Sequence, residues 1–326
     1  MKKLIKIFLL CALCIVGAVG AWAYLELRPQ SAAAYASLAS VAPKGPTDLA
    51  VRYLGTASLS FDDGETAIME DGFFSRPDIL SVVAGRIPPD DRRIDAGLRQ
   101  AHIRRLAAIF VAHSHYDHAM DTGLVALKTG AVVLGSQSTK YVVEGAGLPD
   151  SRFQLIKDGS TFRFGRFKIT VFETPHSPNP AYPGIIDHVI TPPARADDYK
   201  LGQNYSFLIE HGTRRILVIG SGNFIPGKFK GVKADIVFLG ISMAGKQGDG
   251  FVKAYWHEAV QQTGAKLVIP IHWDDFFQPL GNPLNALPAK LDDFDRTMKV
   301  LVPLARQDGV TLRLPAAYTL IDLDQR

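Results

Sequence analysis

The stretch Val111–Asp121, VAHSHYDHAMD, places three histidines and two aspartates within eleven residues, directly after the apolar run AAIF. Such a run predicts a buried strand, and AMDTGLVALKTG, which follows, has helical spacing. His113 and His115 alternate on an extended backbone, and Asp117 and His118 follow where the strand gives way to the helix. Neutral imidazole suits Zn²⁺ and other divalent metals, and carboxylate adds negative charge. The spacing therefore predicts two adjacent cation sites rather than a hydrogen-bonded polar turn.

The six residues HSHYDH match the pattern His-x-His-x-Asp-His and in this resemble the metallo-β-lactamase superfamily, which carries that motif. The resemblance covers nearly the whole body of the chain, from about Thr47, and implies an α/β fold, a four-layer αββα sandwich with its site at one edge between two sheets. Further histidines follow two later apolar strands, His176 in VFETPHSP and His272 in VIPIHWDDF. The resemblance assigns three ligands to each of two metal ions: His113, His115 and His176 to one, and Asp117, His118 and His272 to the other.

One position departs from the pattern of the family. Its members usually carry an aspartate that bridges both metals, in a Gly-Asp pair after a central strand, and ILVIGSGNF has Gly220 and Ser221 there. Serine is neutral and a poor metal ligand, so the second ion is expected to bind more weakly. Two metals and one tight metal both remain open. Ser221 either hydrogen-bonds a bridging hydroxide or is a structural residue of a tight turn.

Two aspartates are candidates for orienting the ligands from outside. Asp71, in IMEDGFFS, resembles the strand-end aspartate of the branch that includes L-ascorbate-6-phosphate lactonase and N-acyl-phosphatidylethanolamine phospholipase D, although glycine follows it here instead of proline. In that branch the aspartate orients metal ligands. Asp274, close after His272, either orients a ligand imidazole or caps the following turn, as Asp275 could.

The amino terminus predicts a membrane-directing segment. Three lysines precede an uncharged run that ends near Leu25, so residues 1–25 are either a cleaved signal peptide or a retained anchor, and the remainder lies outside the cytoplasm in both cases. This implies a cell-envelope location, periplasmic or anchored to the inner membrane and facing outward. Small residues and prolines over 26–46 predict a linker, the resemblance implies a metallo-β-lactamase-fold domain over 47–326, and the proline-rich stretch 177–204 predicts a flap within it.

Charge and cysteine usage narrow the function classes. Without the three leader lysines the chain has 33 basic and 32 acidic residues, so nucleic-acid binding is not indicated. Both cysteines, Cys11 and Cys14, lie in the leader, so any metal in the body must use histidine, carboxylate and water. Zinc is the expected metal, and manganese or iron are alternatives.

The chemistry of such a site indicates hydrolysis. Metal coordination lowers the pKa of bound water from about 15.7 towards about 7 and polarises a carbonyl or phosphoryl oxygen. We expect a hydrolase acting through a metal-bound hydroxide, with Asp117 as the catalytic residue that also orients the water. The substrate is an ester, a lactone or a phosphodiester, either a small molecule or a lipid-like one. The alternative is a membrane-tethered metal- or ligand-binding protein whose missing bridge has abolished catalysis. The sequence leaves the oligomeric state open.

Overall fold

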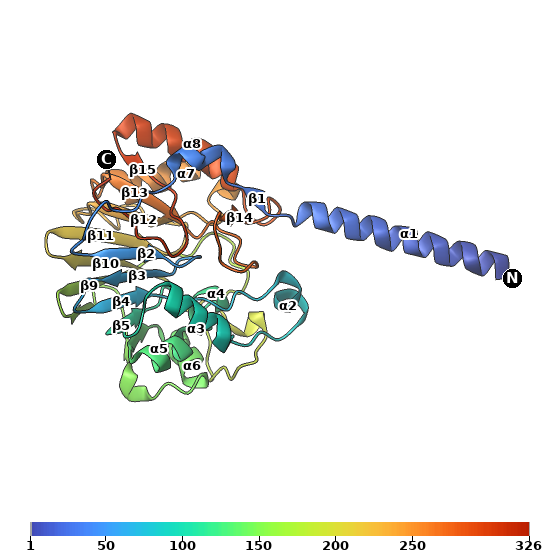
Figure 1. The fold of residues 1–326 in the computed structure, drawn as a ribbon, viewed down its shortest axis with the longest axis horizontal. Coiled ribbons are helices and arrows are strands. Elements are labelled where there is room, and N and C mark those ends of the chain that lie inside the picture. Colours follow the sequence, from blue (N-terminus) through green and yellow to red (C-terminus); the bar gives the residue numbers. More distant parts are fainter. Residues whose placement is uncertain (1, 326) are drawn as a thin grey trace.

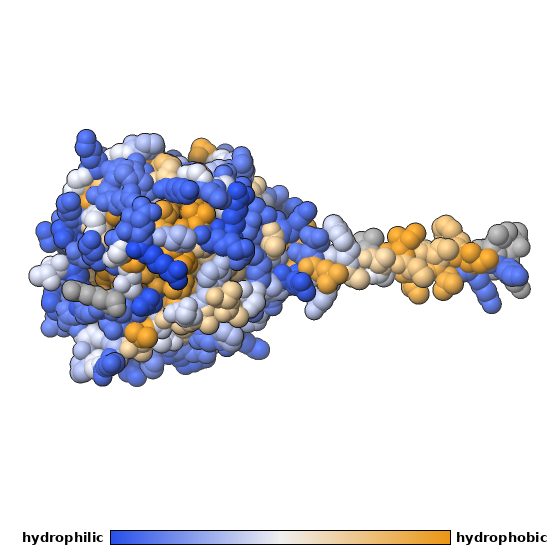
Figure 2. All heavy atoms as spheres, turned by 90° about the horizontal axis from the view of Figure 1, so that it is seen from above, coloured by the Kyte–Doolittle hydropathy of each residue, from blue (hydrophilic) through white to orange (hydrophobic). Residues whose placement is uncertain are grey.

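The computed structural model describes residues 2–325, so Met1 and Arg326, the ends of the expected leader and domain, lie outside the described residues. Helix α1 (Lys2–Glu26) projects away from the body of the molecule (Figure 1). Its segment Ile5–Glu26 is long and apolar enough to cross a membrane, a property that signal sequences share. Figure 2 shows apolar side chains along this helix, whereas hydrophilic residues cover much of the visible face of the body.

The first half of the body forms a six-stranded mixed sheet. In spatial order its strands are β2 (Ala50–Tyr53), β3 (Leu59–Asp62), β4 (Ala67–Glu70), β5 (Ala108–Phe110), β6 (Val132–Gly135) and β7 (Phe153–Leu155). The first three strands are antiparallel, and β4 to β7 run parallel. The turn between β3 and β4 contains an Asp-Gly pair, in which Gly64 has a φ of 85° and the Asp63 carboxylate accepts two backbone N–H groups.

The second half forms a seven-stranded sheet. In spatial order its strands are β15 (Thr311–Leu312), β13 (Leu267–Ile271), β12 (Ile236–Gly240), β11 (Arg214–Ile219), β10 (Tyr205–His211), β9 (Phe167–Glu173) and β8 (Thr161–Phe164). Strands β8 to β11 are antiparallel, and β11, β12, β13 and β15 run parallel. The central parallel strands β5, β12 and β13 are apolar throughout, as strands buried on both faces generally are.

The two sheets pack face to face, with helices on their outer faces (Figure 1). Aromatic rings fill the space between the sheets, including Phe110 and Phe207 with centroids 4.8 Å apart. Helices α3, α5 and α6 cover the first sheet, and α7 and α8 cover the second. The helix bounds are α2 (Ile79–Ala84), α3 (Asp91–Gln100), α4 (Tyr116–Ala119), α5 (Thr122–Thr129), α6 (Gln137–Gly145), α7 (Asp249–Trp256) and α8 (Phe294–Asp308). The predicted αββα sandwich is confirmed.

The segment 26–46 differs from the mobile tether that its composition suggests. Strand β1 (Gln30–Ser31) pairs with β14 (Asn285–Ala286), and the Gln30 side chain donates to the carbonyl of Leu287 at 2.5 Å. A 3₁₀ turn follows over Ala33–Leu38, in which Tyr35 packs edge-on against Phe294 at 5.6 Å. The small residues allow close packing on the body, and composition alone does not distinguish that from flexibility.

The expected flap, residues 177–204, contains one short 3₁₀ turn, Ala196–Asp198, yet much of it is anchored. Ile186 and Ile190 are buried in the core beneath α6. The backbone N–H of Ile186 donates to Ser138 Oγ, and that of Ile190 donates to the Tyr141 carbonyl. The segment is thus fixed to α6 at its centre, and its first residues, from Ser177 to Tyr182, approach the histidines.

We predict that Gly145→Ala loosens this segment. Gly145 ends α6, and a Cβ added to it would overlap the Ile190 carbonyl oxygen, so the backbone of the segment must shift. We expect a loss of about 1–3 kcal/mol in the free energy of unfolding, together with faster proteolysis within 177–204. Gly250→Ala in α7 is the control, since nothing lies within 4 Å of its added Cβ. Equal protease resistance in both variants would contradict the anchored arrangement.

Candidate metal centre

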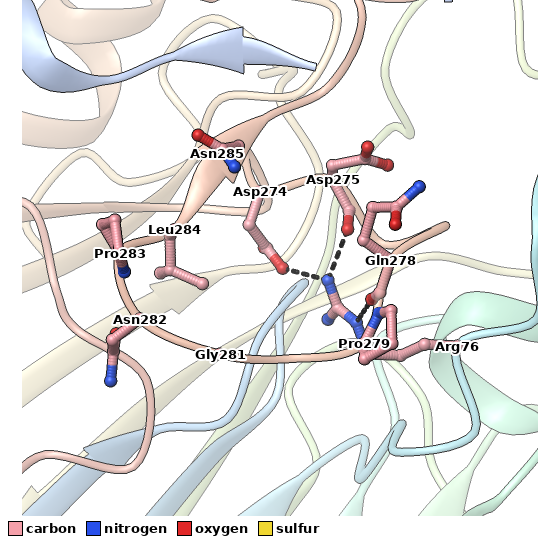
Figure 3. A pocket seen from close by; sticks show the side chains of 10 residues that line it. All are labelled: Arg76, Asp274, Asp275, Gln278, Pro279, Gly281, Asn282, Pro283, Leu284 and Asn285. Atoms are coloured by element: carbon pink, nitrogen blue, oxygen red, sulfur yellow. Dashed lines mark hydrogen bonds and ion pairs between the residues drawn. The ribbon is translucent and has the colours of Figure 1, made fainter. Parts of the chain in front are cut away.

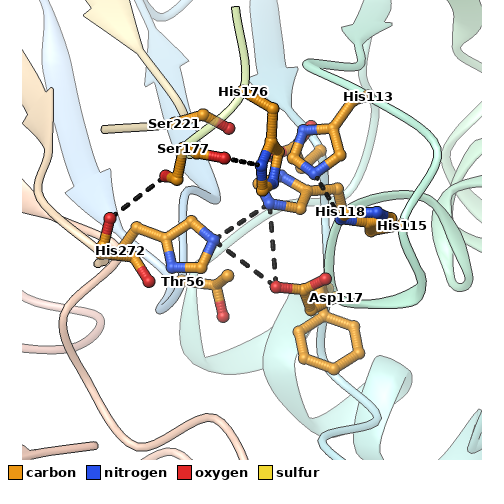
Figure 4. A network of polar contacts seen from close by, with 12 residues as sticks. Thr56, His113, His115, Asp117, His118, His176, Ser177, Ser221 and His272 are labelled. Carbon is orange, nitrogen blue, oxygen red and sulfur yellow. Dashed lines mark hydrogen bonds and ion pairs between the residues drawn. The ribbon is translucent and has the colours of Figure 1, made fainter. Parts of the chain in front are cut away.

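The ends of three buried strands supply the six expected ligands. The extended backbone expected for His113 and His115 is not observed, because β5 ends at Phe110 and both histidines lie in a loop with bends at 112, 114 and 115. Asp117 and His118 lie on α4, the short helix that follows. His176 comes three residues after β9, and His272 directly follows β13. Because these strands end at the same edge of the sandwich, the structure brings all six residues together (Figure 4). They fall into the two sets that the resemblance implies, with the potential ligand atoms of each set within 4.8 Å of one another.

The nitrogen atoms of the site converge as metal ligands do. His113 Nε2 lies 3.0 Å from His115 Nδ1, and His118 Nε2 lies 3.1 Å from His272 Nε2. Asp117 Oδ2 is 3.4 Å from His272 Nε2 and 3.7 Å from His118 Nε2 (Figure 4). Lone pairs that point into one shared space repel each other unless a proton or a cation lies between them. The donor set, imidazole with one carboxylate, therefore fits a divalent cation.

Burial keeps the first set of imidazoles neutral. Desolvation, followed by the neighbouring histidines, holds the pKa of His113 well below its usual value. Burial likewise lowers the pKa of His115 to about 4 and that of His176 to about 3. Neutral imidazole is the form that binds metal, so no proton has to be displaced at neutral pH.

The second set carries the negative charge. Burial alone would raise the pKa of Asp117, but His118 and His272 outweigh it and hold the pKa below its usual range. The pKa of His118 is raised because Asp71 and Asp117 outweigh the effect of burial. A buried carboxylate that stays ionised beside two imidazoles is a ready partner for a cation.

Asp71 contacts His118, one of the candidate ligands. Its Oδ2 accepts a hydrogen bond from His118 Nδ1 at 2.6 Å, which directs His118 Nε2 towards the centre. Its Oδ1 accepts from the backbone N–H of Ala112 at 2.9 Å. Asp71 has a φ of 58° and His272 a φ of 56°, a left-handed backbone that non-glycine residues seldom adopt. Strain of this kind is concentrated at functional sites.

The other two candidates lie further from the imidazoles. Ser221 is buried, and its hydroxyl donates to Asn204 Oδ1 at 3.1 Å, which agrees with the structural alternative for this residue. Asp274 accepts from the Tyr53 hydroxyl at 2.5 Å and from the Thr56 backbone N–H at 2.8 Å. It also pairs with Arg76 at 2.6 Å, in the polar pocket of Figure 3. Asp274 therefore supports the loop at Thr56 rather than an imidazole directly.

Three contributors were not anticipated from the sequence. The Thr56 carbonyl accepts the backbone N–H of His272 at 2.6 Å, and the Tyr182 carbonyl accepts from His115 Nε2 at 3.1 Å. Such backbone contacts leave no signal in a sequence. The third is Glu70, the buried last residue of β4, and here a signal existed. In AIME the alternation of inward and outward residues puts Glu70 on the same face as the core residue Ile68.

A cavity of about 380 Å³ opens beside the centre. His115, Asp117, His176 and His272 form its polar wall, and the rest is mostly apolar, with Tyr182, Met243, Phe276 and Phe277 among the lining residues. None of the described lining residues is a lysine or an arginine. Substrate pockets are commonly concave and apolar with a few convergent polar groups, and this cavity has that form.

Comparison with known proteins agrees with this geometry. Residues 83–273 match the family model described as the beta-lactamase superfamily domain. The chain is 30% identical to a UPF0173 metal-dependent hydrolase of Chloroflexus aurantiacus over 208 residues, 62% of this chain and 78% of that protein. It is 25% identical to a UPF0173 metal-dependent hydrolase of an Exiguobacterium species over 233 residues, covering 69% and 86% of the two chains.

Solved structures are similar in fold at low sequence identity. Igni18, a metallo hydrolase of Ignicoccus hospitalis, superposes with a TM-score of 0.52 at 12% identity, covering 84% of this chain and 98% of that one. CmlA, a diiron β-hydroxylase of Streptomyces venezuelae, has a TM-score of 0.53 at 16% identity, with 84% and 54% covered. At these identities the likeness concerns the fold alone.

We predict that Asp71→Asn weakens metal binding. Asparagine tolerates the left-handed backbone at this position but removes the charge that holds His118. Loss of such an outer partner typically costs about 10–100-fold in metal affinity. Competition with a chromophoric chelator measures it. Asp63→Asn is the matched control. Asp63, in the turn between β3 and β4, also contacts a buried histidine, His211 at 3.0 Å, but this histidine is not one of the six candidate ligands. Equal affinity in the two variants would show that Asp71 does not act on the centre.

Proposed function

The chain belongs to the metallo-β-lactamase superfamily and is a metal-dependent hydrolase, and we propose that it cleaves an ester or lactone with an apolar portion outside the cytoplasm. The observation that carries this proposal is the convergence of the two ligand sets at the wall of an apolar cavity. A divalent cation held by such donors lowers the pKa of coordinated water and polarises a carbonyl or phosphoryl oxygen. Zinc is the first candidate, and manganese and iron also suit these ligands.

The protein's own residues would orient the reaction. Asp117 lines the cavity and stays ionised, so its carboxylate can accept a hydrogen bond from the attacking water. Because its pKa is lowered, the Asp117 carboxylate is a weak base. It is therefore better suited to orient the attacking water than to accept a proton from it as a general base. His115 is fixed by the Tyr182 carbonyl, and His176 Nδ1 by the Ser177 carbonyl at 2.9 Å. Fixed ligands keep the reacting groups in one geometry.

The lining of the cavity discriminates among the three substrate classes. A phosphodiester carries a full negative charge, which a bound metal would offset, but none of the described lining residues is a lysine or arginine that would bind its remaining oxygens. A neutral ester or lactone needs no such partner, and its apolar portion can pack on Tyr182, Phe276 and Phe277. We therefore favour ester or lactone hydrolysis and keep the phosphodiester as the class to be tested against it.

The location outside the cytoplasm is supported by the leader. Lysines precede the apolar segment Ile5–Glu26, which is the arrangement that exports the following chain. On α2 the exposed side chain of Val83 lines the cavity and that of Leu80 is also exposed, which suits a lipid-like substrate. When cells that express the protein with a carboxyl-terminal tag are fractionated, we expect the protein in the envelope fraction. Recovery in the cytoplasm would refute the proposed location. Amino-terminal sequencing then distinguishes a cleaved signal from a retained anchor.

A metal-exchange experiment tests the activity. Protein stripped by a chelator is expected to be inactive and to regain turnover with zinc, manganese or iron on a panel of aryl esters, lactones and bis(p-nitrophenyl) phosphate. We expect esters or lactones to be preferred over the phosphodiester, because the cavity lining is mostly apolar and its described residues add no lysine or arginine to the charge of the metal. Binding of two metal equivalents without turnover on any substrate would favour the alternative, a metal- or ligand-binding protein impaired by Ser221.

A ligand variant provides the matched test within this experiment. His115→Ala removes one of the three imidazoles of the first set. We expect kcat/KM to fall by more than about 100-fold, since the loss of an outer partner alone costs about 10–100-fold. His188→Ala is the control, because His188 is exposed and contacts Asp187 instead of the centre. Matched circular dichroism spectra would establish that both variants are folded, and retained turnover in His115→Ala would refute the assignment.

A further inference from the structure

Glu70 occupies an unusual place for a carboxylate. It is the last residue of β4, fully buried, and pairs across the sheet with Leu59 and Phe110, two residues of the core between the sheets. Its side chain shares their face and therefore points into the space between the two sheets, at the edge where the ligand histidines gather. The next residue, Asp71, contacts His118 directly.

Neither carboxylate oxygen of Glu70 has a hydrogen-bond partner among the described residues. A buried polar group without a partner is costly, and buried charges are normally paired or bound to metal. Burial, and then the neighbouring Asp71, raise the pKa of Glu70 well above its usual range. A carboxylate in this position destabilises the fold unless a positive charge lies close by.

The side chain of Glu70 crosses to the opposite sheet at the position where the family's aspartate is missing. A Cβ added to Gly220, which follows β11, would lie 3.4 Å from Glu70 Oε1. The same Cβ would lie 3.0 Å from Ala112 Cβ and 3.6 Å from Ala57 Cβ, so three small residues leave room for the longer side chain. Ser221, next to Gly220, has its hydroxyl occupied by Asn204.

The adjoining ligand, His113, lacks the partner that a metal-bound imidazole usually has. Its Nε2 faces His115, and its Nδ1 is buried without a hydrogen-bond partner among the described residues. The second nitrogens of His115, His118 and His176 each have an acceptor, and that of His272 has none. His113 follows Ala112, and the Ala112 Cβ and Glu70 Oε1 both lie close to Gly220, 3.0 Å and 3.4 Å from its added Cβ. An acceptor without a donor and a donor without an acceptor thus lie in the same region of the core.

We propose that Glu70 is the buried anion of the first metal site, replacing the charge that Ser221 cannot supply and acting on the site through His113. It is a positioning residue, and the inference rests on the metal-dependent hydrolase function proposed above. A negative charge is needed most at the first set. Its members His113, His115 and His176 are all neutral, whereas Asp117 belongs to the second set. A carboxylate behind a ligand imidazole fixes its tautomer and raises its basicity.

Two variants separate charge from packing. Glu70→Gln keeps the shape and removes the charge, and Glu70→Leu removes the buried polar atoms altogether. We expect each to lower zinc affinity by about 10–100-fold, measured by chelator competition, and to change the visible spectrum of the cobalt-substituted protein as His113 shifts. The melting temperature of metal-free Glu70→Leu should equal or exceed that of the wild type, because an unpaired buried carboxyl has been removed.

A rescue variant makes the test specific. Adding Ser221→Asp to Glu70→Gln restores a carboxylate at the edge of the centre, and we expect zinc affinity to recover by about tenfold or more. Glu258→Gln is the matched control, since Glu258 is also buried but accepts a hydrogen bond from the Gly227 backbone beside α7. It should bind zinc as the wild type does.

The outcomes distinguish this inference from the proposed function. If the wild type binds zinc at His115 and turns over substrate while both Glu70 variants retain wild-type affinity and cobalt spectra, the role of Glu70 is refuted and the hydrolase stands. If the wild type binds no metal, the proposed function itself fails. If neither Glu70 variant folds, Glu70 is a structural residue and the inference also falls.

Discussion

The packing of the two sheets against each other is the constraint on which the site depends. Aromatic contacts such as that between Phe61 and Phe238, with centroids 6.2 Å apart, hold the inner faces together, and face-to-face sheets generally lie about 10 Å apart. At that separation side chains that follow strands of opposite sheets can meet. His113 and His118 follow β5 of the first sheet, and His272 follows β13 of the second. The centre thus joins the two halves of the sandwich, and a shift between the sheets would separate its ligands.

Electrostatics then divides the site into unlike halves. The first set consists of neutral imidazoles whose pKa values are lowered chiefly by burial. The second set contains Asp117 and is backed by Asp71, so negative charge is concentrated on that side. Metals bound at the two sets would therefore experience different fields, and an additional anion is needed mainly at the first. Glu70, which lies between the sheets, is the buried carboxylate at that edge whose oxygens have no partner among the described residues.

The sequence predicted the candidate ligands better than the residues and contacts that hold them in position. The motif and the strand-end positions of His176 and His272 were sufficient to name all six candidate ligands, which the structure brings together, because residues that follow the ends of these strands lie at one edge of the sheets. The packing of 30–38 on the body was not predicted, since small residues favour a linker and close packing equally. Glu70 was overlooked because alternation along a strand separates two faces without identifying which one lies inward. Asn204 and Ser221 lie opposite each other just beyond the paired residues of β10 and β11, so their contact depends on the exact register of that hairpin.

The attachment of the amino-terminal segment also bears on substrate access. Strand β1, close after α1, pairs with β14, and Leu287, the residue that follows β14, lines the cavity. Figure 1 shows α1 leaving the body on the same side as α2, whose exposed Val83 lines that cavity. If the leader is retained as an anchor, the short connection between α1 and β1 holds this apolar rim close to the membrane surface. An amphiphilic ester could then reach the ligands without fully leaving the lipid, since its apolar portion would pass from the bilayer to the apolar wall. If the leader is cleaved, the same rim remains on a freely diffusing enzyme, and access to such substrates depends on the rim alone.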